Sequence, residues 1–575
     1  MSLSLQRRYG FKKSGLKSES YTRPPPSHRH SGPSAPWPWI NLHDEIDATQ
    51  LASPLPPIPE LCKHEDCGGC WIGYPQSRFP NWTPSQVRRS RIHKAITEYR
   101  HEIPCKIYSV NVDTKGYFTD AGEQLVSAEN QDEYWDFLIN QPHSDDNRVQ
   151  ALFVENMSGP VLQMLGTRYN IEPFFFSSSL CWIPSRFQEE VKPGKGDHIT
   201  ITLTFLRTMD TYLPSAASST SSTVTEHAYW NGTDVTYMAL PRFRSYTVLD
   251  DVINTQAPLY LSSGDGCYLI LDLLAVHLIR NVEGNTIISY HHTDPDATSA
   301  QYLQERIRFA GQSVYWQSIF QKSPDPTFVL LVYAWHAMYA WDEALETLYN
   351  HICYLETQVM TTSDMRMTQS LHIIRAHHLH YTSLLEDFRK SILFILNTPN
   401  PAMDSLPELD RAFSRKLLEK ECNHLLSEID RLEMGRMMQD KRLKNVMNLV
   451  FSTVNIGDSR RMQDLTEAAV RDSAAMKQIA YLSMIFLPAS CVAAIFGMNV
   501  REIADGTTET LPHYFAIALP LTALTIWIVM TFQSRYMFGT RQTTFIERLA
   551  WPVLLFKSVF RRDVPNTSSE DLPLR

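Results

Sequence analysis

Two uncharged apolar segments near the C-terminal end constrain this chain more than any other feature. Ile479 to Phe496 is 18 residues long and Tyr514 to Phe532 is 19, and neither contains a charged side chain. A helix that crosses a bilayer needs about 20 predominantly apolar residues. The alternative for each segment is a buried core helix, which two such segments side by side disfavour. The sequence therefore predicts two transmembrane helices.

Flanking charge predicts how these segments are oriented. Positive residues precede the first segment at Arg460, Arg461, Arg471 and Lys477, and follow the second at Arg535, Arg541, Arg548, Lys557, Arg561 and Arg562. The short loop between the segments holds only Arg501. Because Lys and Arg stay on the cytoplasmic side, we expect both termini in the cytosol, or inside an organelle, and the loop outside. The plasma membrane is favoured over an organellar one.

A long segment without proline precedes the first apolar segment. No proline occurs between Pro407 and Pro488, and apolar residues recur every three or four positions, at Leu425, Ile429, Leu432, Leu443, Met447, Val450 and Val454. This spacing predicts one stalk helix, about 120 to 135 Å long at a rise of about 1.5 Å per residue. The alternative is a pair of helices broken near Gly435 or Gly457. The apolar seams of a single stalk would favour self-association.

The fold class expected is an α/β cytosolic domain, a long stalk helix and two C-terminal transmembrane helices. Residues 198–207, 267–279 and 285–292 are strand-like, whereas 132–140 and 159–170 are helical in pattern. The Ser/Thr-rich residues 213–229 predict an inserted loop. The predicted regions are a disordered Pro/Ser-rich tail (1–60, alternatively a transit peptide), the α/β domain (61–325), the helical region with the stalk (326–478), the first span (479–498), the outer loop (499–513), the second span (514–533) and a basic cytosolic tail (534–575).

Composition and motifs exclude several classes of function. The net charge of -9, with no long Lys/Arg block beyond the first 30 residues, argues against a nucleic-acid partner. The sequence has no P-loop, no Gly-x-Ser-x-Gly and no dinucleotide fingerprint. We therefore expect neither an enzyme nor an organic cofactor.

Two clusters could ligate a metal. Cys62, His64, Cys67 and Cys70 carry the side chains of a tetrahedral zinc site, although their spacing is compressed and no second pair follows. His372, His377, His378 and His380 fall on a predicted helix, where we expect their rings to face water rather than metal.

The first apolar segment ends on an unusual tripeptide. "FLPASCVAAIFGMN", residues 486–499, closes on Gly497, Met498 and Asn499. Gly and Asn are ordinary residues for a helix end. Here, however, they lie at the end of the first of two spans, after a stalk and before a loop with Glu502, Asp505 and Glu509. This position makes a chance helix end a poor explanation of the tripeptide. Residues 325–540 resemble CorA-type magnesium transporters, whose signature is Gly-Met-Asn at the pore mouth. Residues 148–178 look like the N-terminal domain of fungal CorA-like proteins.

The resemblance implies a homopentamer in the lipid bilayer that conducts divalent cations, with Mg²⁺ as the transported ion and also as a regulatory ion between cytosolic domains. Asn499 would contact the hydrated ion, Gly497 would permit the turn, and Met498 would pack the mouth. The outer carboxylates Glu502, Asp505 and Glu509 would either concentrate cations or keep the loop soluble.

Met476, Ser483 and Ser490 lie seven residues apart and so share one face of the first span. We expect this face to line the pore; the alternative is a small-residue contact between helices.

Two departures from the family pattern leave alternatives open. Phe496 stands where the family more often has Tyr, and the loop lacks the usual Met-Pro-Glu-type sequence. Three predictions therefore remain. The chain conducts Mg²⁺, or it is a Zn²⁺, Ni²⁺ or Co²⁺ transporter of the same architecture, or it is a non-conducting membrane anchor with an interaction domain.

Overall fold

The computed structural model describes residues 48–54, 57, 59–60, 62, 69–140, 146–210, 248–249, 252–264, 266–292, 298–361, 365–495, 497, 506, 510–533 and 549–550. The chain divides into two units, Met1–Ser452 and Thr453–Arg575. Most of the predicted N-terminal tail and the whole Ser/Thr-rich insertion lie outside the described residues. Among the tail residues that are described, Ala48–Ala52 form the short helix α1. The predicted domain boundaries stay predictions.

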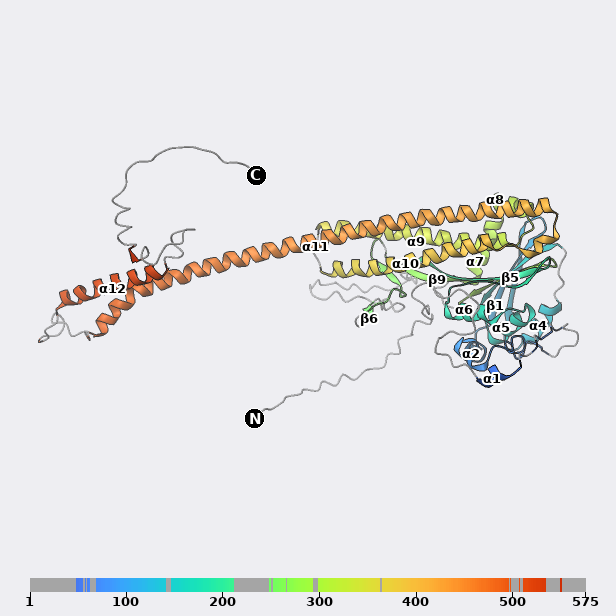
Figure 1. Cartoon of the computed structure of the whole chain (residues 1–575), viewed down its shortest axis with the longest axis horizontal. Helices are drawn as coiled ribbons and strands as arrows, with labels where there is room; N and C mark the ends of the chain where they lie inside the picture. Colours follow the sequence, from blue (N-terminus) through green and yellow to red (C-terminus); the bar gives the residue numbers. More distant parts are fainter. Residues whose placement is uncertain are drawn as a thin grey trace, which may run out of the picture. The chain divides into compact units, whose positions relative to one another are not determined.

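A mixed, mostly antiparallel sheet forms the centre of the first unit (Figure 1). Its order is β2-β1-β3-β10-β9-β5-β4, with β8 paired to β9, and only β3 and β10 pair in parallel among these strands. The predicted strands correspond to β5, β9 and β10. The strands are β1 (Cys105–Asp113), β2 (Phe118–Val126), β3 (Asn147–Glu155), β4 (Ser185–Lys192), β5 (Gly196–Asp210), β8 (Leu259–Leu261), β9 (Cys267–Asn281) and β10 (Asn285–His291); β6 (Val248–Leu249) and β7 (Val252–Ile253) form a separate pair.

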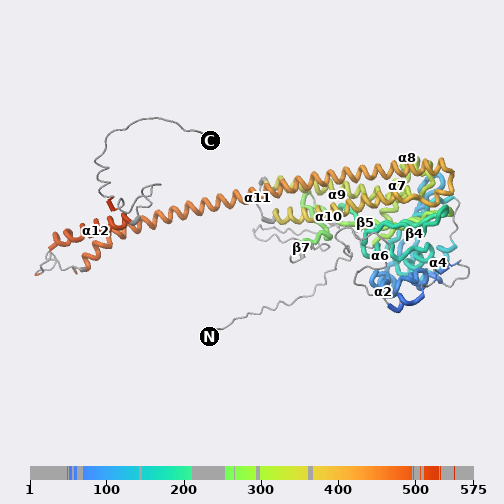
Figure 2. Tube along the Cα trace, viewed as in Figure 1, coloured from blue at the N-terminus to red at the C-terminus, as the bar shows by residue number. Residues whose placement is uncertain are grey.

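Helices cover both faces of this sheet (Figures 1 and 2). One layer consists of α2 (Pro84–Arg89), α3 (Ile92–Thr97), α4 (Gln131–Asn140), α5 (Gly159–Arg168) and α6 (Pro173–Cys181). The other consists of α7 (Ala300–Gly311), α8 (Val314–Lys322), α9 (Thr327–Thr361), α10 (Met365–Asn397), the short 3-10 helix η1 (Pro401–Ser405) and the start of α11 (Glu408–Ile495). The predicted α/β fold with a long stalk helix is confirmed.

Alternation along β5 separates the two faces of the sheet. Thr200 pairs with His277 of β9, whose ring lies 5.2 Å from that of Phe175 on α6. Asp197 pairs with Arg280, whose guanidinium donates to the Thr327 hydroxyl at the start of α9. Successive residues of a strand point to opposite faces. In this part of β5, Thr200 therefore faces α6, whereas Asp197 faces α9.

A buried ion pair joins the sheet to the long helices. Arg280 and Asp197 are fully buried, and the Nε of Arg280 donates to Oδ1 of Asp197 over 2.6 Å. The same guanidinium donates to the Pro399 carbonyl over 3.1 Å, just beyond α10. These N–H groups of Arg280 all donate to oxygen atoms, so the buried positive charge is compensated. The hydrogen bonds hold the start of α9 and the end of α10 against β9.

The first part of α11 packs through a seam with a seven-residue repeat. Most of its buried positions are spaced alternately by four and three residues: Leu418, Cys422, Leu425, Ile429, Leu432, Arg436, Gln439, Leu443, Val446 and Val450. Polar contacts hold α9 along this seam, since Gln439 donates to the Leu345 carbonyl over 2.8 Å and Arg431 to Asp342 over 2.9 Å. The unbroken helix rules out the predicted alternative of a break near Gly435 or Gly457.

The histidine prediction is wrong at three of four positions. His372 is exposed, but His377, His378 and His380 are buried on α10, which lies in the helical layer beside the sheet. Burial lowers the pKa of His377 to about 3 and that of His378 to about 4, so both rings are neutral. A neutral imidazole is apolar enough to pack in this layer, which the helical spacing alone did not reveal.

Candidate functional site

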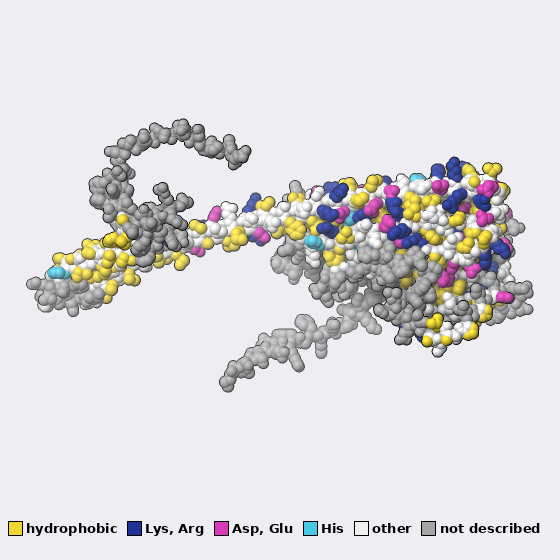
Figure 3. Space-filling view, viewed as in Figure 1, with side chains coloured by type: hydrophobic (Ala, Val, Ile, Leu, Met, Phe, Trp, Pro, Cys, Tyr) yellow, Lys and Arg dark blue, Asp and Glu magenta, His cyan; other side chains and the backbone are white. Residues whose placement is uncertain are grey.

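The end of α11 and helix α12 (Leu511–Gln533) are apolar and exposed. Among the described residues, these are the two helices long and apolar enough to cross a membrane, and few residues of either apolar stretch are buried. Hydrophobic side chains dominate their visible surface in Figure 3. A core helix of a soluble protein would bury such residues. The alternative of two buried core helices is therefore wrong for the described residues.

The two helices pack on each other through a few residues. Val492 of α11 and Ala518 of α12 are buried, and the hydroxyl of Tyr514 donates to the Ala489 carbonyl over 3.2 Å. Small residues let two helices approach closely in an apolar medium. The pair forms a hairpin whose remaining surface stays open to lipid or to other protein.

The predicted pore-lining residues lie on one exposed face of α11. Met476, Ser483 and Ser490 are all exposed, and the Ser490 hydroxyl donates to the Leu487 carbonyl over 2.9 Å. In a membrane such a bond satisfies the hydroxyl hydrogen within the helix. The face is therefore free for a contact from outside the chain, and its role stays a prediction.

Gly497 lies just beyond the last residue of α11. Its φ of 55° is left-handed, and its amide donates to the Ala494 carbonyl over 3.1 Å. This geometry is usual for the glycine that ends a helix, where a Cβ is strained by the positive φ. Met498, Asn499, Glu502, Asp505 and Glu509 lie outside the described residues. The functional part of the tripeptide therefore stays a prediction.

Comparison with known proteins bears on this same region. Residues 270–533 match the family described as CorA-like Mg2+ transporter protein. This region belongs to the CorA-like family. It runs from β9 of the sheet to the end of α12 and includes both candidate membrane helices.

Solved structures give weaker likenesses to this chain. The complete CorA magnesium transporter from Methanocaldococcus jannaschii matches with a TM-score of 0.35 and 12% identity, over 75% of this chain and 98% of that one. The soluble domain of the same transporter matches at 0.31 and 10%, over 60% and 96%. The full-length CmaX protein matches at 0.32 and 11%, over 74% and 97%. No curated protein sequence matches.

The predicted Cys/His cluster is only partly described. Cys62 and Cys70 are half-buried, whereas His64 and Cys67 lie outside the described residues. Zinc binding by these four residues therefore stays a prediction.

Sequence reasoning missed a second cluster, in the sheet. Glu189, His198 and His277 come from β4, β5 and β9 and place their ligand atoms within 4.8 Å of one another. Glu189 pairs directly with His198, and His277 with Thr200, two residues further along β5. The period-two pattern of the strands could have placed the histidines on one face, but not in register with Glu189.

Burial controls the charge of this cluster. It lowers the pKa of His198 to about 4 and that of His277 well below its usual value, so both are neutral. Burial also raises the pKa of Glu189 to about 7. Glu172, at the start of α6, has its pKa raised to about 8 by burial and by the neighbouring Glu189 carboxylate. The two carboxyl groups can therefore hold a proton at neutral pH.

Proposed function

We propose that the chain forms a homo-oligomer, a homopentamer as the family resemblance implies, that conducts divalent cations across a membrane, with Mg²⁺ as its principal ion. The match of residues 270–533 to the CorA-like Mg2+ transporter family carries this proposal. The two exposed apolar helices support it, because one copy with two spans cannot enclose a pore.

Asn499 is the proposed first contact of the ion. Mg²⁺ gives up its waters reluctantly, so a selective mouth holds the hydrated ion through hydrogen bonds from water to oxygen acceptors. A ring of Asn499 amide oxygens, one from each copy, offers such acceptors. The left-handed Gly497 supports this placement, since it ends α11 two residues before Asn499.

Below the mouth, the Met476, Ser483 and Ser490 face would line the path. Seven residues make about two helical turns, so these three side chains lie on one face of the helix. From the first to the third, they extend about 21 Å along the helix axis at a rise of about 1.5 Å per residue. The carboxylates Glu502, Asp505 and Glu509 would raise the local cation concentration outside.

Uptake of Mg²⁺ by a magnesium-transport-deficient cell tests the proposal. Native chain, Asn499→Ala and the control Thr508→Ala, in the same loop, are compared at equal surface amount and oligomer size. We expect uptake to fall to background with Asn499→Ala and to persist with Thr508→Ala, because only the first removes the amide ring. No uptake by a correctly placed native oligomer would overturn the proposal and favour a non-conducting anchor. Zn²⁺, Ni²⁺ and Co²⁺ in the same assay establish the ion.

A further inference from the structure

We propose that Glu189, His198 and His277 bind one transition-metal ion of the Zn²⁺ class inside the first unit. This site is separate from the proposed conduit, since all three residues belong to the sheet. It also does not depend on whether the chain conducts.

The geometry is that of an open ligand set. The Nδ1 of His198 lies 3.8 Å from Oε1 of Glu189, and the Nε2 of His277 lies 3.9 Å from the same oxygen. Both distances are too long for hydrogen bonds. Two ligands on a tetrahedral Zn²⁺ with bonds of about 2.0 to 2.1 Å lie about 3.4 Å apart. Each of these two nitrogen–oxygen distances is therefore about half an ångström longer than the spacing of two ligands on Zn²⁺. All three ligand atoms lie within 4.8 Å of one another.

Two buried nitrogens in this cluster have no partner. Neither Nδ1 of His198 nor Nε2 of His277 is hydrogen-bonded within the described part of the chain, and the side chain of His277 is 0% exposed. Buried polar atoms are normally paired. What distinguishes these two nitrogens is that both face the same carboxylate oxygen, Oε1 of Glu189. A metal ion between them satisfies both nitrogens and the carboxylate together.

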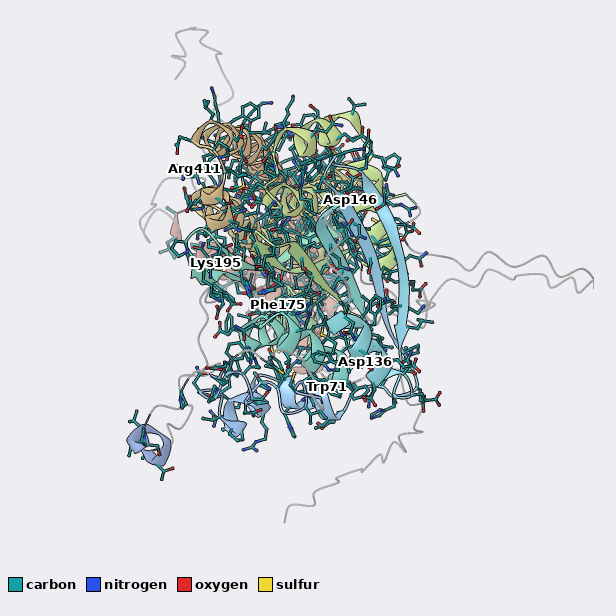
Figure 4. All side chains as sticks on the ribbon, turned by 90° about the vertical axis from the view of Figure 1, so that its right-hand side faces the viewer. Trp71, Asp136, Asp146, Phe175, Lys195 and Arg411 are labelled. Carbon is teal, nitrogen blue, oxygen red and sulfur yellow. The ribbon has the colours of Figure 1, made fainter. Side chains whose placement is uncertain are left out.

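The surroundings orient His277 for ligation. Its Nδ1 lies 2.8 Å from the buried Thr200 hydroxyl, which can accept a hydrogen bond from Nδ1–H. The lone pair of Nε2 then faces Glu189. Phe175 of α6, labelled in Figure 4, packs its ring 5.2 Å from the imidazole and limits its rotation. The ring therefore has its ligating edge fixed before any ion arrives.

The donor set favours the Zn²⁺ class over Mg²⁺. Two imidazole nitrogens and one carboxylate suit Zn²⁺, Co²⁺ and Ni²⁺, whereas Mg²⁺ requires oxygen ligands in an octahedron. The carboxyl group of Glu172 lies beside Glu189, whose Oε1 accepts from the Glu172 amide over 3.4 Å, and can supply a fourth ligand. Glu189 lies on the edge strand β4 and His198 on the neighbouring strand β5, and their side chains are 14% and 13% exposed, which leaves a route for entry.

Co²⁺ titration of the purified full chain tests the site, because Co²⁺ in a tetrahedral nitrogen and oxygen field absorbs visible light. The chain is stripped with chelator, held in excess Mg²⁺ and studied with Cys62→Ser, Cys67→Ser and Cys70→Ser as the common background. We expect one Co²⁺ per chain, displaced by Zn²⁺. Glu189→Gln, which keeps the side-chain volume, and His277→Gln should each weaken Co²⁺ binding more than about 100-fold, since loss of a direct ligand exceeds that of an outer partner.

His351→Gln is the matched control, because His351 is also buried but lies on α9 outside the cluster. It should bind Co²⁺ like the background chain. Circular dichroism and oligomer size show whether each variant is folded, and Glu189→Gln remains decisive if His277→Gln fails to fold. Absence of a visible Co²⁺ band in the background chain, or an unchanged affinity in folded Glu189→Gln, would overturn the proposal.

Discussion

Both parts of α11 carry apolar side chains, but these side chains differ in whether the chain itself covers them. In the first unit, Leu425 and Leu443 are 0% exposed against the neighbouring helices. In the second unit, Leu465 is 70% exposed and Met476 is 72% exposed. The same helix thus buries apolar side chains of one part within its own chain and leaves those of the other part uncovered.

The exposed apolar side chains in the second part of α11 indicate contacts with something outside the chain. Apolar side chains that stay exposed over many turns mark a protein or membrane interaction site. Within the described residues, only α12 packs on the end of α11, through Val492 and Ala518. In the proposed oligomer, lipid and further copies of the chain would cover the remaining surface.

The largest effect is expected from Leu443→Ala in the buried seam. Removing a fully buried leucine side chain leaves a cavity and should lower the free energy of unfolding of the first unit by about 2 to 5 kcal/mol. Denaturant unfolding of the full chain in detergent, followed by fluorescence of Trp335 and Trp341 on α9, measures it. A decrease in the free energy of unfolding of less than about 0.5 kcal/mol would contradict the burial of Leu443 in the seam.

A smaller effect is expected from acid acting on the packed part. Burial holds the pKa of His378 near 4 when folded, whereas an unfolded histidine titrates near 6.5. Its stabilising effect is fully present above pH 6.5 and is lost as the pH falls toward 4, by up to about 1.4 kcal/mol per pH unit. His378→Leu should reduce the slope of stability against pH in this window. An identical slope in both proteins would show that His378 is not buried neutral.

The smallest effect on unfolding is expected from Leu465→Ala, the same substitution made in the exposed part. Because the side chain has no cover within the chain, the unfolding free energy of the first unit should change by less than about 0.5 kcal/mol. Oligomer size measured against detergent concentration should instead show easier dissociation. If Leu465→Ala unfolds the first unit as much as Leu443→Ala, the contrast between the two parts fails.

The sequence predicted the elements of the fold because their signals are local. Alternation marked β5, β9 and β10, and the absence of proline marked α11. It could not predict which apolar residues are covered, since Leu443 and Leu465 belong to one unbroken helix and only the neighbouring elements decide which of them is buried. It also misplaced His377, His378 and His380, because burial depends on which elements pack together and not on the spacing of the histidines.

The candidate sites divide in the same way. Gly497 has the left-handed backbone expected of a glycine at a helix end, which is a local feature of the sequence, whereas its part in ion selection stays a prediction. The Glu189, His198 and His277 cluster was not predicted, because three strands distant in sequence meet only through sheet register.

Thiol labelling of the Met476–Ser490 face tests most directly whether the exposed part of α11 surrounds an ion path. Ser483→Cys and Ile485→Cys, about 200° apart around the helix at about 100° per residue, are each made in a Cys491→Ser background, because Cys491 is exposed. Mg²⁺ flux into liposomes is recorded before and after a charged thiol reagent. We expect the reagent to block flux through Ser483→Cys and to leave Ile485→Cys and the background unchanged. Unchanged flux through labelled Ser483→Cys, or equal block of both variants, would contradict a pore lined by this face.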